Sequence, residues 1–264
     1  MYYDPIKNRF ASAIALFSDL RIAFYWILDM LLLRQAYVKR EINRYMSNQT
    51  PLRFYDAGAG FCQYSWFVLK NDPHATVMAT DLKNDYLADF SSYAAIHFPG
   101  RFTYQTADLQ DYTTASVYDL AVAIDILEHI PDDVAAMQNL YNSLAPGGIL
   151  IISTPSDLDE AAKYTEEHVR PGYNKADLEQ KLSSVGFEIS NSRYTYGFWG
   201  ALSWKLCMKY PMNLISIHKS LALILPLWYL LIYPFAFVMM QLDLRADNPR
   251  GTGILTVARK SIDK

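Results

Sequence analysis

The sequence predicts an α/β protein whose central parallel sheet is covered by helices on both faces. From Leu52 onward, five short runs rich in apolar or β-branched residues alternate with helical patterns. The runs are LRFYDA, ATVMATD, FTYQTAD, DLAVAID and GILIIST, and the helical patterns fall at about 62–71, 84–97 and 132–144. Strands that alternate with helices form parallel sheets, because each crossover helix packs on one face of the sheet.

Two further strands complete the core and divide the chain into three regions. KADLEQKLSSVGFEIS reads as a helix that stops at Gly186 and leads into a sixth strand, and GTGILTVARK reads as a seventh strand. We therefore expect an N-terminal helical lid over 1–50, a core over 51–197 and 249–264, and a hydrophobic helical insertion over 198–248.

Composition narrows the classes of function. The 264 residues carry a formal net charge of −3, so the total implies no basic surface and no nucleic-acid partner is expected. Two cysteines, Cys62 and Cys207, cannot build a disulfide framework. The N-terminal residues lack the pattern of a signal peptide, so we expect a cytoplasmic protein.

The insertion is strongly apolar, with no charged residue from Ser220 to Leu242. That length is enough to cross a bilayer. A single crossing would, however, leave the last strand on the wrong side of the membrane from its sheet, and Pro226 and Pro234 interrupt the run. We therefore expect either a buried helical lid or a re-entrant or surface-lying membrane element.

A glycine turn follows the first strand, in the stretch DAGAGFCQ that begins at Asp56. Ligands bind at the carboxyl ends of the strands in open parallel sheets. Gly58 and Gly60 would let backbone N–H groups approach an anionic group of such a ligand. Gln63 stands where a dinucleotide-binding turn has its last glycine, so a single carboxylate suits this turn better than a pyrophosphate.

The order of motifs along the chain resembles that of class I S-adenosylmethionine-dependent methyltransferases. The motifs are DAGAG after the first strand, Asp81 after the second, ADL after the third, DILEHIPD after the fourth and LAPGG before the fifth. The subgroup resembled is the small-molecule type (methyltransferase type 11), which includes the ubiquinone-biosynthesis O-methyltransferases. The resemblance covers about 50–197 and the last strand. It implies a Rossmann-like seven-stranded sheet, mostly parallel with the last strand antiparallel between the fifth and sixth, and S-adenosyl-L-methionine as cofactor.

The resemblance implies which residues hold the methionine end of that cofactor. Asp56, Gly58 and Gly60 match the positions that hold the methionine portion, and Asp125 matches the acid near the transferred methyl group. Cys62 stands where many members of the family have a third glycine, which packs the helix start against the sheet. Cysteine is small enough for that place, so we expect binding to be retained.

The resemblance also implies which residues hold the nucleoside. Asp81, with Leu82 beside it, matches the acid that holds the ribose hydroxyls. Asp108 matches the residue that contacts the adenine amine, with Leu109 beside the ring.

Two histidines are candidates for the catalytic base. Methyl transfer from a sulfonium needs alignment of the reacting atoms and removal of a proton from an oxygen or nitrogen acceptor. His129 in DILEHI and His168 in TEEHVRPGY could remove that proton. DILEH also resembles the metal cluster of some methyltransferases, in which Asp125, Glu128, His129 and His168 would bind a divalent ion. We favour the metal-free alternative, because the Glu-His pair is widespread in metal-free relatives.

The acceptor is predicted to be a small lipophilic molecule, with a hydroxyl as the favoured target. Residues 12–45 and 198–245 are rich in Trp, Tyr, Phe and Leu, and helices of that composition can form an apolar pocket. The basic stretch Arg34–Arg44 could meet anionic headgroups in a peripheral membrane contact, or could be a solvated helix face. The alternative functions are an NAD(P)-dependent oxidoreductase on a related fold and a non-catalytic, membrane-associated cofactor-binding scaffold.

Overall fold

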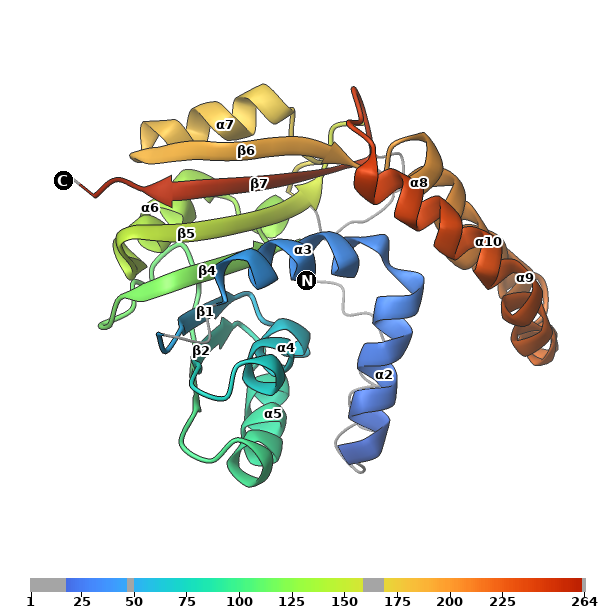
Figure 1. Ribbon diagram of the computed structural model, residues 1–264, viewed down its shortest axis with the longest axis horizontal. Helices are drawn as coiled ribbons and strands as arrows, with labels where there is room; N and C mark the ends of the chain where they lie inside the picture. The colour runs from blue at the N-terminus through green and yellow to red at the C-terminus, as the bar shows by residue number, and fades with distance from the viewer. Residues whose placement is uncertain (1–17, 47–49, 159–168, 263–264) are drawn as a thin grey trace.

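The computed structural model of the protein describes residues 18–46, 50–158 and 169–262. Its centre is a seven-stranded sheet with the strand order β3-β2-β1-β4-β5-β7-β6 (Figure 1). The strands are β1 (Arg53–Ala57), β2 (Thr76–Asp81), β3 (Phe102–Thr106), β4 (Tyr118–Ile124), β5 (Leu144–Pro155), β6 (Phe187–Thr195) and β7 (Gly253–Lys260). The pairs from β3 to β5 are parallel, whereas β7 is antiparallel to both β5 and β6. The predicted fold class is therefore confirmed.

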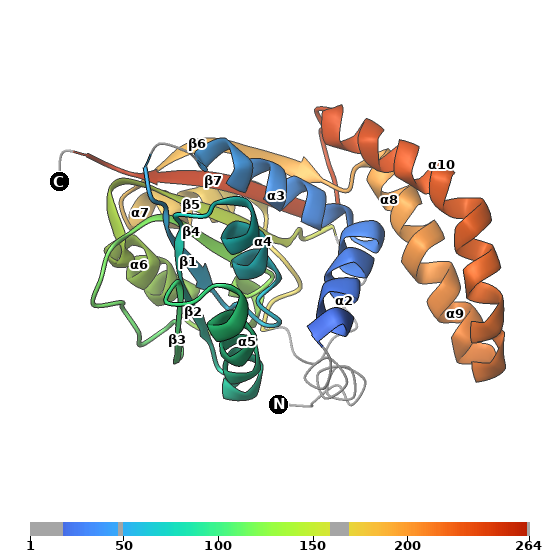
Figure 2. The same ribbon diagram turned by 60° about the horizontal axis from the view of Figure 1, so that its bottom comes forward.

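Helices cover both faces of this sheet, as expected for parallel strands joined by crossovers. The helices between the strands are α4 (Gln63–Asn71), α5 (Asn84–His97), α6 (Asp133–Ser143) and α7 (Lys175–Ser184). Adjacent residues of a strand point to opposite faces, so Phe54 of β1 enters the core under α4 and α5, and Tyr55 enters the core under α6 and α7. Figure 2 shows α4 in front of the sheet and α6 and α7 behind it.

One boundary differs from the sequence-based expectation. β5 begins at Leu144 rather than at Gly148. The pairing with β4 passes from Tyr118–Leu144 to Leu120–Ile149, so the residues between Leu144 and Ile149 form a bulge inside the strand. The LAPGG motif is therefore part of the sheet rather than a separate turn before it.

Two N-terminal helices, α2 (Ser18–Leu31) and α3 (Leu33–Tyr45), lie beside the sheet on the α4 side (Figure 2). Tyr37, Val38 and Ile42 of α3 are fully buried in the core of that side. The helical pattern predicted from residue 12 is thus present from Ser18, and residues 1–17 lie outside the described residues.

Between β6 and β7 the chain forms a helical hairpin that projects from one end of the sheet (Figure 1). We use the name hairpin for Phe198–Arg245. Its outgoing leg consists of α8 (Phe198–Trp204), a π-helical turn η3 (Lys205–Lys209) and α9 (Tyr210–Ile217). A 3₁₀ turn η4 (Lys219–Ile224) forms the tip, and α10 (Leu225–Arg245) returns to the sheet.

The carboxylate of Asp243 joins the base of the hairpin to the rest of the protein. This side chain is fully buried in α10 and accepts hydrogen bonds from the Tyr37 hydroxyl of α3 at 2.9 Å and from the Gly200 amide of α8 at 3.0 Å. Gly200 is required there, because an added Cβ would lie 2.7 Å from Asp243 Oδ2. One buried carboxylate therefore ties α3, α8 and α10 together.

We expect Asp243→Ala to lower the free energy of unfolding by about 2 kcal/mol, because it leaves the buried Gly200 amide without an acceptor, whereas the Tyr37 hydroxyl keeps the backbone carbonyl of residue 243, at 2.7 Å in the natural chain. Urea denaturation measures the loss, and limited proteolysis should show new cleavage within the hairpin. Tyr37→Phe removes a single hydroxyl and should cost about 1 kcal/mol. Equal losses for the two variants would contradict the central role of Asp243.

Candidate functional site

The candidate site lies where the order of the strands reverses. β1 and β4 are neighbours, and from them the chain builds outward in opposite directions. In open α/β sheets, ligands bind at the carboxyl ends of the strands at this position. The loops after these strands touch there, since a Cβ added to Gly58 would lie 2.6 Å from Cγ1 of Ile126. The glycine turn, Asp81 and Asp125 all lie at this edge of the sheet.

The turn after β1 uses left-handed backbone at three positions. The φ angles of Gly58, Gly60 and Cys62 are +75°, +50° and +58°. The third glycine position of the family thus has a positive φ here as well, and Cys62 adopts that conformation while its side chain is fully buried in the core. Left-handed backbone costs a non-glycine residue about 1 kcal/mol, and the burial of the thiol offsets this cost.

The amide groups of the turn correct one sequence-based expectation. Gly58 and Ala59 both donate to the carbonyl of Thr80, at 2.8 and 2.9 Å, and Gly60 donates to Asp81 Oδ2 at 2.9 Å. These three N–H groups therefore do not face an anionic ligand. They attach the turn to the end of β2, and the bond from Gly60 holds the half-exposed carboxylate of Asp81 at this edge of the sheet.

Asp56 lies beneath the turn, with only 2% of its surface exposed. Its Oδ2 accepts hydrogen bonds from the Ser65 amide at 3.0 Å and the Ser65 hydroxyl at 2.7 Å, which fixes the first turn of α4. Burial raises the pKa of Asp56 to about 6, the bonds from Ser65 lower it, and the nearby charge of Asp81 raises it. Asp56 therefore changes charge close to neutral pH.

Asp125 follows β4 with a positive φ of +49° and forms an ion pair with Arg34 of α3. The Arg34 amide donates to the Tyr196 hydroxyl at 3.0 Å, and burial raises the pKa of the nearby Tyr64 hydroxyl, which the charge of Arg34 lowers. Arg34 thus lies over the carboxyl edge of the sheet. Sequence analysis identified Arg34 only as the start of a basic stretch and missed its contact with Asp125.

The nucleoside residues occupy the neighbouring strand ends. Asp108 follows β3, and its carboxylate accepts hydrogen bonds from the backbone amide and the side chain of Gln110. Leu109 is buried beside the strand core, whereas Leu82 after β2 is 54% exposed. The structure therefore brings the predicted acids to one edge, with Asp81 and Asp108 on adjacent strands.

The loop after β4 contains Glu128 and His129 in a short 3₁₀ helix, η1 (Leu127–His129). Glu128 is 1% exposed, burial raises its pKa, and it accepts a hydrogen bond from the Thr154 hydroxyl at 3.2 Å. The amide of Val169 donates to the Glu128 carbonyl at 3.1 Å, so the segment that begins at Val169 lies against this loop. His168, the second candidate base, lies outside the described residues.

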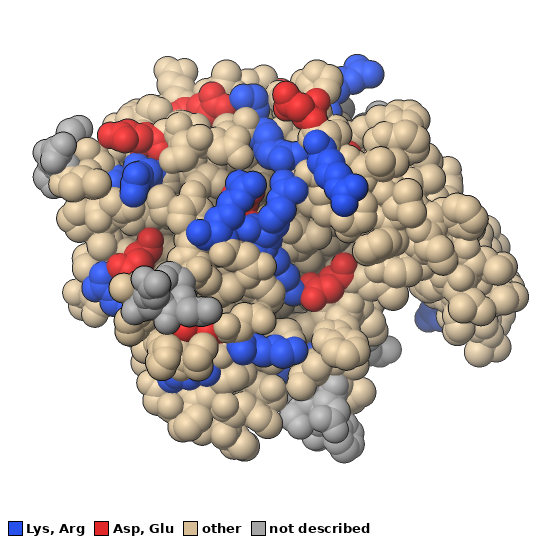
Figure 3. Space-filling model, viewed as in Figure 1, with Lys and Arg blue, Asp and Glu red and all other residues tan. Residues whose placement is uncertain are grey.

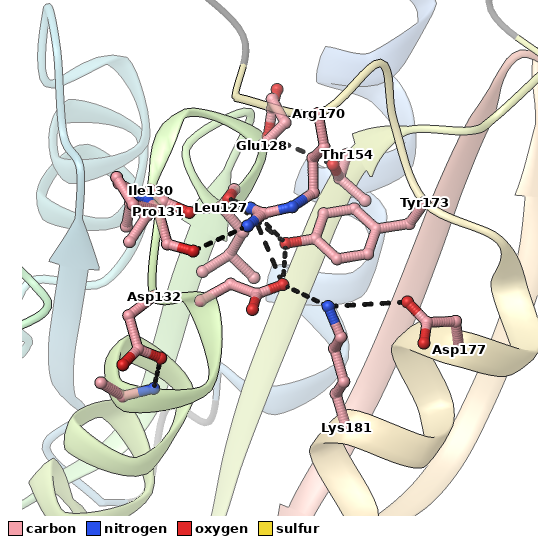
Figure 4. Close-up of polar contacts among 12 residues, drawn as sticks. Leu127, Glu128, Ile130, Pro131, Asp132, Thr154, Arg170, Tyr173, Asp177 and Lys181 are labelled. Carbon is pink, nitrogen blue, oxygen red and sulfur yellow. Dashed lines mark hydrogen bonds and ion pairs between the residues drawn. The ribbon is translucent and has the colours of Figure 1, made fainter.

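A polar network holds the same loop in place (Figure 4). Arg170 donates to the carbonyls of Leu127, Ile130 and Pro131 at 2.6, 2.8 and 3.0 Å. Asp133 accepts hydrogen bonds from Tyr173 at 2.6 Å and Lys181 at 2.8 Å. Burial would raise the pKa of Asp133, but these donors and the charge of Arg170 lower it overall. The network supports the loop, in which His129 is half-buried and its charge lowers the pKa of the neighbouring Glu128.

Within the part of the chain that the structure describes, no group of three or more His, Cys, Asp or Glu side chains is placed to hold a metal ion. Asp125 is paired with Arg34, and Glu128 is buried against Thr154. His168, the further ligand of the metal hypothesis, is not among the described residues.

Comparison with known proteins identifies the domain that carries this site. Residues 55–150 match the family described as a methyltransferase domain. A trans-aconitate 2-methyltransferase from Streptomyces avermitilis is 29% identical over 110 residues, which cover 41% of this chain and 41% of that protein. One from Rhodopseudomonas palustris is 28% identical over 110 residues, 42% of this chain and 41% of that protein. The chain thus spans about two fifths of the length of these curated relatives.

Solved structures share the fold over most of the chain. The [4+2]-cyclase SpnF is 16% identical with a TM-score of 0.60, covering 86% of this chain and 80% of that one. Phosphoethanolamine N-methyltransferase 2 of Haemonchus contortus, in complex with S-adenosyl-L-methionine, is 19% identical with a TM-score of 0.61, covering 93% and 57%. The domain match and this shared fold confirm the predicted resemblance to class I S-adenosylmethionine-dependent methyltransferases.

The raised pKa of Asp56 predicts a pH-dependent stability. The folded protein holds the proton of Asp56 up to about pH 6, whereas an unfolded aspartate loses it near pH 4. The contribution of Asp56 to the free energy of unfolding should therefore fall by roughly 3 kcal/mol as the pH rises from 4 to 6, and then stay constant.

Asp56→Asn keeps an acceptor for Ser65 but cannot ionise. Relative to the natural chain, this variant should gain stability between pH 4 and pH 6, as measured by urea denaturation at closely spaced pH values. Parallel pH profiles for the two chains would show that Asp56 does not titrate in this range.

Proposed function

We propose that the chain binds S-adenosyl-L-methionine and transfers its methyl group to a small, lipophilic acceptor, with oxygen as the receiving atom. The observation that carries the proposal is the bond between Gly60 and Asp81 at the switch point, inside the segment that matches a methyltransferase domain. This bond places the carboxylate of Asp81 beside the glycine turn. The carboxylate would bind the ribose of the cofactor, and the turn would lie beside its amino-acid tail. An NAD(P)-dependent oxidoreductase is not favoured by the comparisons.

The residues of the site fit this cofactor. Gln63 Oε1, at the start of α4 directly after the turn, is buried and finds no hydrogen-bond partner among the described residues. Buried polar atoms are normally paired, so this oxygen suits the ammonium group of the amino-acid tail of the ligand. Asp81 accepts two backbone bonds and retains lone pairs for the two ribose hydroxyls. A Cβ added to Gly60 would meet nothing within 4 Å, which leaves that side of the turn open.

Arg34 and Asp125 complete the methionine end. The guanidinium of Arg34 is suited to a carboxylate and the carboxylate of Asp125 to an ammonium group, so the two side chains match the charges of an amino acid. When bound, the cofactor supplies a methyl group already activated on a sulfonium. The protein then has to align the acceptor and accept its proton, and His129 and His168 are proposed for that step.

The choice of acceptor rests on the helices that border the site. α2 carries exposed Trp26 and Ile27, at 64% and 47%, and the hairpin is apolar along α10. Trans-aconitate, on which the curated relatives act by their names, is small and strongly anionic. The match to the methyltransferase domain, residues 55–150, does not include the hairpin. We therefore favour a lipophilic acceptor over a polycarboxylate. Peripheral contact of the protein with a membrane would accompany the binding of such an acceptor. A non-catalytic cofactor-binding scaffold remains the alternative.

Asp81→Ala should weaken the binding of S-adenosylhomocysteine by about ten- to a hundredfold, because a hydrogen bond to a charged group contributes about 1.5–3 kcal/mol. Isothermal titration calorimetry measures this affinity. Asp85→Ala removes an exposed carboxylate from the first turn of α5 and should leave the affinity unchanged. Unchanged binding in Asp81→Ala would contradict the proposed cofactor site.

The acceptor class can be read from the fate of a labelled methyl group. The protein is incubated with methyl-labelled S-adenosylmethionine and an extract of its native cells, and the label is followed into lipid and aqueous fractions. We expect label in the lipid fraction, and none with Asp81→Ala. Transfer to added trans-aconitate, or label only in the aqueous fraction, would contradict a lipophilic acceptor. Cofactor binding without transfer to any fraction would support the scaffold.

A further inference from the structure

We propose that the hairpin binds anionic phospholipid bilayers and lies flat in the membrane interface, with α10 among the acyl chains and its lysines at the headgroups. The proposed lipid binding stands on the features of the hairpin alone. Its use for delivering the acceptor rests on the proposed function above.

The first feature is an apolar helix that the protein itself leaves uncovered. Within the described residues, one helical segment, Lys219–Arg245, is long and apolar enough to cross a membrane, with a mean hydropathy of 2.1 over its most apolar part. Only 6% of that part is buried inside the protein, and Leu223, Leu230 and Phe235 are 85%, 73% and 65% exposed. A surface helix of a water-soluble protein carries polar residues on its outer side, and this helix carries almost none.

The second feature is the sign and position of the charges. The sequence from Phe198 to Leu242 contains three lysines, Lys205, Lys209 and Lys219, and no aspartate, glutamate or arginine. All three are exposed, and none forms an ion pair with a described residue. Cations without acidic neighbours complement anionic headgroups, and long lysine side chains reach the headgroups from an apolar helix.

The third feature is that the two legs of the hairpin differ in the polarity of their exposed side chains. Lys205, Lys209, Asn213 and Ser216 are all exposed and recur at helical spacing, so they form a polar stripe along the outgoing leg. The exposed side of α10 is apolar, and the face of the hairpin shown in Figure 3 is nearly free of charged side chains. The hairpin is thus amphipathic as a unit, which favours an interfacial position over a crossing.

The fourth feature is that backbone carbonyls of the outgoing leg accept hydrogen bonds from side chains of α10. The π-helical turn and Pro211 disturb the regular bonding of this leg. The carbonyls of Leu206 and Cys207 accept hydrogen bonds from Trp228 Nε1 at 3.1 Å and from the Tyr229 hydroxyl at 2.8 Å, both from α10. In lipid, where no water is present, backbone groups must find partners within the protein. These carbonyls have such partners without water.

The basic stretch on α3 contributes less than the sequence predicted. Figure 3 shows Lys and Arg side chains gathered over α3 on the same broad face as α10. Arg34, Lys39 and Arg44 are, however, paired with acids of the chain, and Arg40 donates to the carbonyl of Leu244 at the end of α10. The lysines of the hairpin therefore carry the electrostatic argument.

A second copy of the chain is the main competing occupant. A dimer contact would cover one side of the hairpin, whereas the exposed apolar residues continue from α10 around the tip to Ile217, which is 77% exposed. A bilayer in which α10 lies among the acyl chains covers α10 and the tip together. The hairpin also begins and ends at the carboxyl-end side of β6, so the lipid surface would lie close to the candidate site (Figure 1).

The test uses a polarity-sensitive fluorophore on the full chain. Both native cysteines are buried, so Leu230→Cys can be labelled selectively, with Ile96→Cys on α5 (77% exposed in the natural chain) as the matched control. Vesicles of phosphatidylcholine with phosphatidylglycerol should shift the emission of the label at 230 to the blue and leave that at 96 unchanged. The same shift at rising protein concentration without vesicles would assign the hairpin to a second copy and overturn the proposal.

Sedimentation with the same vesicles tests the energetics. Leu227→Asp combined with Leu230→Asp should lower binding by at least about tenfold, because two leucines are lost from the apolar phase. Lys205→Glu with Lys209→Glu should lower it severalfold and remove most of its salt dependence. Equal binding by the aspartate variant and the natural chain would overturn the proposal. If the natural chain binds vesicles but does not bind S-adenosylhomocysteine, the proposed function is refuted and this inference stands.

Discussion

The position of β7 between β5 and β6 is the constraint on which the rest of the structure depends. β7 is hydrogen-bonded on both sides, so the chain must leave β6 and return to the same end of the sheet. Everything inserted there is forced into a closed excursion, and the shortest helical excursion is a hairpin of two antiparallel legs. Asp243 then fixes the angle at which this hairpin leaves, because its carboxylate joins α8, α10 and α3.

Four acids gather at the carboxyl edge of the sheet, and the protein treats the charge of each in a different way. Asp56 is buried and retains its proton to about pH 6. Asp81 is held by the amides of Gly60 and Lys83, Asp125 by the guanidinium of Arg34, and Asp108 by the side chain of Gln110. Neighbouring carboxylates repel one another unless each is compensated separately. The site is therefore made of acids that differ in charge and availability although they share one edge.

Local patterns were enough to predict the strands, the crossover helices and the presence of several acids at one edge of the sheet. A strand end followed by Asp or Gly is visible in the sequence, and parallel topology brings all such ends to one edge, which is why Asp81 and Asp125 could be placed. The position of Arg34 could not be predicted, because its ion pair with Asp125 joins α3 to the loop after β4. These two segments are far apart in the sequence, and no local pattern shows that they meet. The use of the turn amides was also hidden, since their acceptor, the carbonyl of Thr80, belongs to another strand.

The two buried thiols allow the local opening of two segments of the protein to be measured. Cys62 lies inside the glycine turn and Cys207 lies between the legs of the hairpin, and both are fully buried. An alkylating reagent reaches a buried thiol only while the surrounding segment is open. The rate of alkylation at Cys62 thus counts openings of the ligand turn, and the rate at Cys207 counts separations of the hairpin legs. The natural chain thus reports the opening of the glycine turn and of the hairpin as two separate alkylation rates.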